Sequence, residues 1–208
     1  MLHVKVTSAN PDPAVIVRGV EILRLGGVVA YPTDTLYGLA VDPRSGAAVE
    51  RLFEIKGRVL SVAVPLIAAD LAQAETFGSF GAIERQLAHE FWPGPLSIVV
   101  PASPAISAAA LGGGDTVALR VPAHALARAL AQTFGSCITA TSANLSGQLA
   151  SARAAEVRAA LAERIDMLLD GGDAPGGMPS TIVRVDRGRP TLLRAGAIAW
   201  ERVLKSLQ

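Results

Sequence analysis

The sequence is poor in the residues that build metal centres and disulfides. Among its 208 residues there is one cysteine, Cys137, and there are three histidines, His3, His89 and His124. A single cysteine cannot close a disulfide within the chain, and the histidines lack the spacing of metal ligands. Cys137 lies in an apolar run, where a cysteine acts as a small core residue. We therefore exclude a disulfide scaffold, expect no metal site built from protein side chains alone, and expect a reducing, cytoplasmic setting.

Long apolar runs and a strong net charge are lacking as well. Mean hydropathy is +0.39, but no apolar stretch approaches the ~20 residues that a membrane-spanning helix needs. The amino-terminal stretch MLHVKVTSANPD has no continuous apolar segment of the kind found in signal peptides. A formal charge of +1 gives no general attraction to nucleic acid, although arginines are frequent in residues 184–194. These features predict no membrane contact and leave RNA binding to a local basic patch.

Aromatic residues make up only 4% of the chain, whereas 50% of it is apolar, so Ala, Val, Leu and Ile must fill the core. Such a core suits helices packed on a buried sheet, and helix and strand patterns alternate along the chain. Strands are expected at residues 2–6, 28–31, 62–67, 96–100, 117–121, 137–141, 166–169, 181–185 and 191–194. Helices are expected at residues 13–25, 47–55, 82–91, 123–134, 152–164 and 200–207, with a short helix after Asp70.

This alternation predicts the α/β class. We expect a single three-layer domain over residues 1–208, with one twisted sheet of about seven strands. Because tight turns join some neighbouring strands, the sheet should be mixed, with parallel and antiparallel pairs. The glycine-rich segment 170–179 is too short to separate two cores and is expected to be a mobile loop.

Four polar clusters stand out, and most of them follow an expected strand, where open α/β sheets place ligands. The first is the Thr-Asp-Thr triplet at residues 33–35, whose hydroxyls can hold a carboxylate or phosphate or can close a Ser/Thr turn. The second is Lys56-Gly57-Arg58 at a helix end, outside the core. Its cations can stabilise the helix dipole, or they can grip a polyphosphate that approaches the backbone at Gly57.

The third cluster is TATSANLSG at residues 139–147, where small side chains and four hydroxyls follow a strand. Its backbone N–H groups can cradle an anion, or Ser142 or Asn144 can be the N-cap of a helix. The segment lacks the Gly-Lys-Ser/Thr of a Walker loop, and no G-x-S-x-G elbow of serine hydrolases occurs in the sequence.

The fourth cluster is spread over three expected strands and comprises Thr116, Arg120, Ser180 and Arg194. An arginine inside an apolar strand is costly unless its charge is paired. Asp or Glu side chains could pair Arg120 and Arg194, but we favour an anionic ligand as the partner of both. Arg120 is then expected to lack a carboxylate partner within the protein.

Taken in order, these clusters resemble the YrdC-like threonylcarbamoyl-adenylate synthase family. The matching segments are YPTDTLYGLAVDP (31–43), IKGR (55–58), PLI (65–67), FWPGPLSIVV (91–100), ALRVP (118–122), TSANLSGQ (141–148), PSTIV (179–183) and LLRAGAI (192–198). They span nearly the whole chain. One such segment is weak evidence, whereas eight in the order of the family are specific.

The resemblance implies a YrdC/RibB-like fold with a positively charged concave face. Members condense L-threonine, bicarbonate and ATP into threonylcarbamoyl-AMP and pyrophosphate. A downstream transferase then moves the threonylcarbamoyl group to adenosine 37 of tRNA, so tRNA or double-stranded RNA is an expected partner. The resemblance also implies Mg²⁺ held mainly by the phosphates of ATP, and no organic prosthetic group. Longer members carry an extra C-terminal domain, which this chain is expected to lack.

The resemblance also assigns roles to the polar residues. Lys56 and Arg58 are expected to be catalytic, because cations at the phosphates stabilise the charge of the transition state. The residues expected to bind ATP are Lys56, Arg58, Thr116, Ser142, Asn144 and Arg194. The residues expected to bind threonine are Thr33, Thr35, Arg120 and Ser180, and the planar fork of Arg120 fits a carboxylate.

Two residues depart from the family pattern, and two other activities stay open. Val59 stands where proline is common, and Ala69 stands where some relatives have a histidine near threonine. A carbamoyl-adenylating module of hydrogenase maturation would use the same phosphate site. A non-catalytic double-stranded-RNA-binding factor would use the basic face, but recognition of RNA shape needs no phosphate-gripping cluster of this kind.

Overall fold

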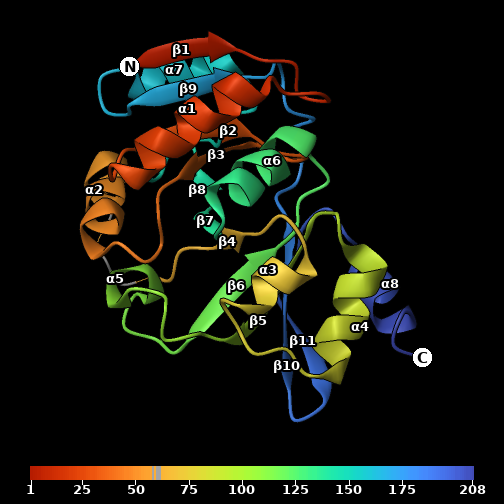
Figure 1. Ribbon diagram of the computed structural model, residues 1–208. Coiled ribbons are helices and arrows are strands. Elements are labelled where there is room, and N and C mark those ends of the chain that lie inside the picture. Colours follow the sequence, from red (N-terminus) through yellow and green to blue (C-terminus); the bar gives the residue numbers. More distant parts are fainter. Residues whose placement is uncertain (58, 60–61) are drawn as a thin grey trace.

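The computed structural model describes residues 1–57, 59 and 62–208 (Figure 1). The helices are α1 (Pro13–Arg24), α2 (Gly46–Lys56), α3 (Leu71–Glu75), α4 (Ala82–Phe91), α5 (Ala108–Leu111), α6 (Ala125–Phe134), α7 (Ala154–Leu161) and α8 (Trp200–Lys205). The strands are β1 (Leu2–Lys5), β2 (Val29–Pro32), β3 (Tyr37–Ala40), β4 (Leu66–Ile67), β5 (Leu96–Pro101), β6 (Thr116–Arg120), β7 (Ile138–Thr139), β8 (Thr141–Ser142), β9 (Met167–Asp170), β10 (Thr181–Asp186) and β11 (Arg189–Arg194).

The strands of the described chain form two sheets. The first has the order β1-β9-β2-β3-β8 and the second has the order β11-β10-β5-β6-β4-β7. Each sheet is mixed: β1, β9 and β2 are parallel while β2, β3 and β8 are antiparallel, and in the second sheet β10 is parallel to β5 and β4 to β6. The α/β class and the mixed pairing are thus confirmed, but the prediction of a single sheet is wrong.

Short buried strands explain this error. β3 is not among the expected strands, because all four of its residues are buried and show no alternation of apolar and polar side chains. β4, β7 and β8 have two residues each, too few to show any period. The strand expected at residues 62–67 is reduced to Leu66–Ile67.

The chain crosses from the second sheet to the first at Ala140. β7 ends just before this residue and pairs with β4, whereas β8 begins just after it and pairs with β3. The Ala140 N–H donates to Pro65 O at 2.8 Å. The hydroxyl of buried Thr139 accepts from Val41 N–H and donates to Leu39 O, each at 2.9 Å. A side chain therefore satisfies the backbone groups where regular strand pairing is interrupted.

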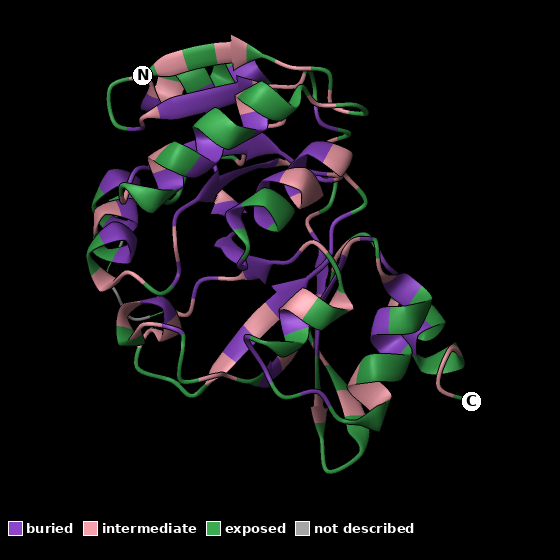
Figure 2. Cartoon of the chain, viewed as in Figure 1, coloured by how far each residue is buried: buried purple, intermediate pink, exposed green. Residues whose placement is uncertain are grey.

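The two sheets differ in how they are covered. In the first sheet β2 is buried at every residue, and α1 and α6 pack side by side over it (Figures 1 and 2). In the second sheet β6 alternates: Val117 and Leu119 lie in the core, whereas Thr116 and Ala118 are partly exposed. Because strand side chains alternate, Arg120 shares the open face of Thr116 and Ala118. No helix among the described residues combines the length and apolar character needed to cross a membrane.

Asp166 ties α2 to the strands of the first sheet. Its carboxylate accepts hydrogen bonds from Arg51 Nη1 at 2.7 Å, Arg51 Nη2 at 3.0 Å and Val28 N–H at 2.7 Å. Partial burial raises the pKa of Asp166, but the hydrogen bonds from Arg51 and Val28 outweigh burial and hold this pKa below its usual range. The charged form of Asp166 therefore stabilises the fold.

Replacing Asp166 by Asn should destabilise the protein by about 1 kcal/mol, a modest value because the pair is partly exposed. Thermal melts near neutral pH should show a loss of about 2–4 °C. The folded-state pKa is lowered, so the wild-type advantage is present above the unfolded pKa of about 3.9 and is lost as the pH falls through the lower folded value. Asp173→Asn, at an exposed aspartate, is the matched control, and an unchanged difference down to low pH would contradict this role.

Candidate functional site

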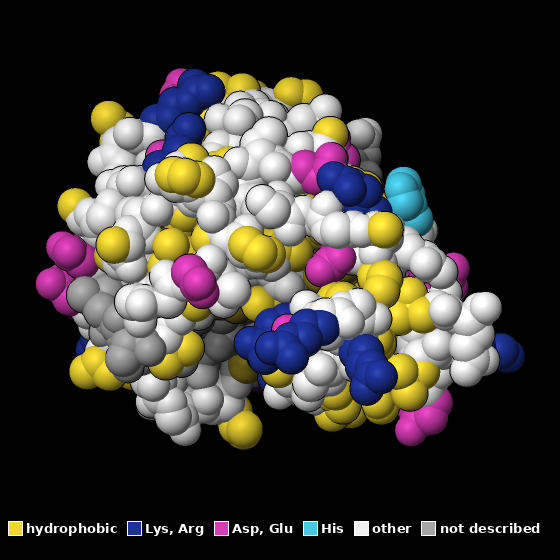
Figure 3. Space-filling view, turned by 90° about the horizontal axis from the view of Figure 1, so that it is seen from below, with side chains coloured by type: hydrophobic (Ala, Val, Ile, Leu, Met, Phe, Trp, Pro, Cys, Tyr) yellow, Lys and Arg dark blue, Asp and Glu magenta, His cyan; other side chains and the backbone are white. Residues whose placement is uncertain are grey.

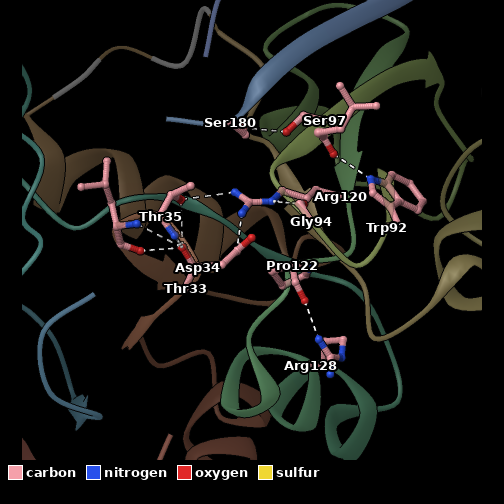
Figure 4. Close-up of polar contacts among 12 residues, drawn as sticks. Thr33, Asp34, Thr35, Trp92, Gly94, Ser97, Arg120, Pro122, Arg128 and Ser180 are labelled. Carbon is pink, nitrogen blue, oxygen red and sulfur yellow. Dashed lines mark hydrogen bonds and ion pairs between the residues drawn. The ribbon is translucent and has the colours of Figure 1, made fainter. Parts of the chain in front are cut away.

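Arg120, at the end of β6, joins the two sheets (Figure 4). Its Nη2 forms an ion pair with Oδ1 of Asp34, which lies in the turn between β2 and β3. Its Nε donates to Gly94 O at 2.9 Å, and its Nη1 lies 3.4 Å from Thr35 Oγ1. The Arg120 and Asp34 side chains are only 9% and 11% exposed. The prediction that Arg120 lacks a carboxylate partner is therefore wrong, and the physical reason is the high free energy of an unpaired buried guanidinium.

The Thr-Asp-Thr triplet forms a turn, which is one of the two interpretations offered by the sequence. Thr33 Oγ1 donates to Leu36 O at 2.7 Å and accepts from the N–H groups of Thr35 and Leu36, each at 3.2 Å. Thr33 thus closes a Ser/Thr turn. The Thr35 hydroxyl lies 3.1 Å from Thr33 Oγ1 and faces Arg120, so the turn presents Thr35 and Asp34 to the guanidinium (Figure 4).

Ser180 and Arg194 form a second polar group beside Arg120. The Ser180 hydroxyl is buried and lies 2.9 Å from Ser97 Oγ. Arg194 Nη2 donates to Ser180 O at 2.6 Å and to Ser180 Oγ at 2.9 Å, and Nε donates to Ser180 O at 3.1 Å. Burial, and then the positive charge of Arg120, lower the pKa of Arg194. An anion between the two guanidiniums would relieve this repulsion.

Gly196 fixes Arg194 in this position. A β-carbon on Gly196 would lie 2.4 Å from both Pro179 O and Thr181 N, which no real side chain tolerates. The Ala197 N–H donates to Pro179 O at 2.9 Å in the same contact. Glycine is needed here because the two backbones pass so closely, and this contact sets Arg194 against Ser180.

Lys56 ends α2 and extends into the loop that follows β8. Its Nζ donates to Ser142 O at 2.5 Å and to Asn144 O at 2.9 Å, and it lies 3.3 Å from Asn144 Oδ1. The Lys56 O accepts from Ser146 N–H at 2.8 Å. Only 5% of Lys56 is exposed, so the expectation that it lies outside the core is wrong. A buried ammonium needs oxygen acceptors, and the carbonyl groups of this loop supply them.

Asn144 shapes the same loop. Its Oδ1 accepts from Ser142 Oγ at 2.5 Å, and its Nδ2 donates to Leu145 O at 3.0 Å and to Gln148 O at 2.6 Å. The next helix, α7, begins only at Ala154, so the interpretation of Ser142 or Asn144 as a helix N-cap is wrong. Side-chain hydrogen bonds maintain the curved shape of this loop. Its small residues lie near the end of β8.

Gly57 is required by backbone conformation. It has φ 63° and ψ 40°, the left-handed geometry of a residue that ends a helix, and it follows α2 directly. This local requirement accounts for the glycine without a ligand. Arg58, the other predicted catalytic cation, lies outside the described residues.

The predicted residues fall into two groups at one end of the first sheet. Gly38 of β3 pairs with Ser142 of β8, and the two strands are antiparallel. Thr35 precedes β3 and Asn144 follows β8, so both lie at the same end of this strand pair. Thr116 stands apart from Arg120 at the start of β6, about 13 Å away at ~3.3 Å per residue. A surface hollow between α4 and α8, lined by Ala82, Arg85, Gln86, His89, Glu90 and Ser206, contains none of the predicted residues.

Sequence reasoning missed three residues of this site. Asp34 was noted only as part of the triplet, Ser97 was not noted, and His124 was set aside as scattered. Asp34 and Arg120 are 86 residues apart, so no local pattern could pair them. The usable signal for His124 was its place two residues after Pro122, just beyond the strand that ends in Arg120.

Comparisons with known proteins show the family and the fold. The Sua5/YciO/YrdC family model, described as "Telomere recombination", matches residues 21–196. A Thiobacillus denitrificans protein named threonylcarbamoyl-AMP synthase is 40% identical over 174 residues, which are 83% of this chain and 91% of that protein. A Pyrococcus abyssi protein of the same name is 37% identical over 184 residues, which are 88% of this chain. The chain spans about half of that relative, 54% of its length.

Solved structures also match. The structure of P. abyssi Sua5 complexed with L-threonine superposes with a TM-score of 0.94 at 34% sequence identity. The match covers 100% of this chain and 61% of that one. Its arrangement of sheets and helices is therefore the fold of this chain.

Replacing Arg120 by Met should destabilise the fold, because Asp34 would keep a buried charge without a partner. Breaking such a pair costs about 3–5 kcal/mol. At about 2–4 °C per kcal/mol, thermal melts should show a loss of roughly 6–20 °C. The double variant Asp34→Asn/Arg120→Met should recover much of this loss. Arg85→Met, which breaks a more exposed ion pair with Glu75, should change the melting temperature far less.

A wild-type melting temperature for Arg120→Met would show that the ion pair does not stabilise the fold.

Proposed function

Because the chain belongs to the Sua5/YciO/YrdC family, we propose that it is an L-threonylcarbamoyladenylate synthase. It would condense L-threonine, bicarbonate and ATP into threonylcarbamoyl-AMP and pyrophosphate. The observation that carries this proposal is the pairing of two neighbouring arginines, Arg120 and Arg194, with buried hydroxyl groups at one end of the sheets. Such a site can bind a small carboxylate and a polyphosphate side by side.

Arg120 and Thr35 are proposed to bind the threonine carboxylate, with Thr33 and Ser180 nearby. Arg120 Nε is committed to Gly94 O and Nη2 to Asp34, but Nη1 has only a long contact of 3.4 Å to Thr35 Oγ1. A guanidinium has five N–H donors, so Arg120 retains capacity for a carboxylate without losing Asp34. The ion pair then serves to hold the guanidinium in place before the substrate arrives.

The loop after β8 is proposed to hold the phosphates and nucleoside of ATP, through Ser142 and Asn144. Lys56 would act by holding this loop and by adding positive charge near the phosphates. Arg58, Thr116 and Arg194 complete the proposed ATP-binding set. Mg²⁺ would come with the nucleotide, since among the described residues no three His, Cys, Asp or Glu side chains gather into a metal-binding group.

The reaction needs no protein nucleophile. The threonine amine and bicarbonate form a carbamate, whose oxygen attacks the α-phosphate of ATP and displaces pyrophosphate. The protein must position the two ligands and stabilise the negative charge that develops on phosphorus. The cations of the site can meet both needs.

The product is proposed to pass to a separate cytoplasmic transferase that modifies adenosine 37 of tRNA. The β10–β11 hairpin carries exposed Arg184, Arg187 and Arg189. Figure 3 shows the face toward which the hairpin turn projects, where Lys and Arg side chains gather beside hydrophobic ones. This patch is the proposed contact for RNA or the transferase.

We expect pyrophosphate release that requires both L-threonine and bicarbonate, measured with a coupled pyrophosphate assay. Release with carbamoyl phosphate in place of threonine would identify a carbamoyl-adenylating module instead. RNA binding without ATP turnover would identify a purely binding protein. Equal activity with every amino acid would contradict the threonine assignment.

Replacing Lys56 by Met should lower the rate of pyrophosphate release by ~10²–10³, because the loop loses its support and the site loses a nearby positive charge. The KM for ATP should rise more than the KM for threonine, because Lys56 Nζ donates to the loop proposed for ATP. Lys5→Met, at an exposed lysine of β1, is the matched control and should behave as wild type. A rise in the threonine KM alone would move Lys56 to the other end of the site.

A further inference from the structure

Two buried polar atoms near the threonine end of the site have no hydrogen-bond partner among the described residues. They are Oδ2 of Asp34 and Nδ1 of His124. Asp34 uses its other oxygen for Arg120, which leaves Oδ2 as an unused acceptor. A buried polar atom without a partner is costly, so each of these atoms is available to a bound group.

His124 lies at the junction of β6 and α6. It is the N-cap residue of α6, but its side chain makes no capping hydrogen bond. Two charged groups act on it, Asp34 from the β2–β3 turn and Arg128 from α6. Arg120 of β6 pairs with the same Asp34 carboxylate. Burial lowers the pKa of His124, the charge of Asp34 opposes this shift, and Arg128 adds to it. The imidazole is therefore neutral near neutral pH and has one ring nitrogen free to accept a proton.

The proposed reaction has a proton to remove at this end of the site, and the argument here rests on that proposed function. A free amino acid carries its amino group as ammonium near neutral pH. The nitrogen cannot attack bicarbonate until one N–H bond breaks and its electron pair becomes available. The amine and bicarbonate then form the C–N bond of the carbamate, and one water molecule leaves. One proton must therefore be taken up by a base.

We propose that Asp34 and His124 form the site that receives and deprotonates the α-amino group of the amino acid. Asp34 Oδ2 accepts a hydrogen bond from the ammonium and neutralises its charge. His124 Nδ1 takes the proton that the ammonium loses, and the half-buried imidazole returns it to solvent from its exposed side. Arg120 is the positioning residue that holds Asp34 between the carboxylate and amino ends of the substrate.

The ion pair explains why two groups share this task. Asp34 carries an ion pair to Arg120 and keeps Oδ2 without a partner among the described residues, so it can bind a cation. His124 is neutral and beside a carboxylate that stabilises its protonated form. The pairing of a fixed carboxylate with a neutral imidazole is a common arrangement for general-base catalysis.

The test is the pH dependence of pyrophosphate release for His124→Asn. Asn keeps a hydrogen-bonding atom near the position of Nδ1 but cannot take a proton. The wild-type kcat/KM for threonine should be level above the pKa of His124 and fall below it. For His124→Asn the rate should drop by ~10²–10⁴ near neutral pH and should rise steadily with pH, because only substrate that is already an amine can react. His89→Asn, at an exposed histidine of α4, should keep the wild-type profile.

Asp34→Asn provides a second readout. Loss of the negative charge should lower the pKa of His124 further, so the acid limb of the kcat/KM profile should move to lower pH. The KM for threonine should rise, while the KM for ATP should change little. Thermal melts would show which fraction of this variant is folded under the assay conditions.

The outcomes separate this inference from the proposed function. If the wild type shows no threonine-dependent pyrophosphate release, the proposed function fails. If the wild type is active but His124→Asn keeps a level pH profile, even at a lower rate, then His124 is structural and the inference is overturned. An acid limb that stays in place in Asp34→Asn would overturn the coupling between the two residues.

Discussion

The buried ion pair between Arg120 and Asp34 is the contact on which the site depends. It connects the end of β6 in the second sheet to the β2–β3 turn in the first. Both charged groups are buried and have lost their hydration. Such a pair is stable only where its geometry is good and neighbouring groups supply further hydrogen bonds. Gly94 O and Thr35 Oγ1 supply those neighbours. The interaction that organises the site therefore also holds the two sheets in position relative to each other.

The rest of the site follows the same plan of long-range contacts. Lys56 of α2 reaches the loop after β8, and Arg194 of β11 reaches Ser180 before β10. These contacts join different elements of the fold, so they cannot form before the strands themselves are paired. The groups of the site are thus preorganised by the whole fold rather than by a single motif.

The sequence predicted the features that local chemistry determines. Asp12 and Asp70 accept hydrogen bonds at the starts of α1 and α3, as their positions indicated, and most helices begin and end close to the expected residues. The α/β class followed from the alternation of helices and strands, and the mixed pairing followed from tight turns between neighbouring strands. The sequence could not show which groups pair with the buried charged side chains. Arg120 appeared unpaired because Asp34 is distant in the chain, and Lys56 appeared exposed because its acceptors are backbone oxygens, which no residue type reveals.

The crossing at Ala140 imposes a rule on chain length. Loops elsewhere can gain residues at small entropic cost. Here a single residue separates a strand of one sheet from a strand of the other, and side chains on strands alternate with a period of two. One added or deleted residue would exchange the directions of Thr141 and Ser142 and would turn the loop held by Lys56 away from the turn at residues 33–36. The alternation of side chains along the strands fixes the number of residues between buried Thr139 and that loop. This segment therefore has a fixed length.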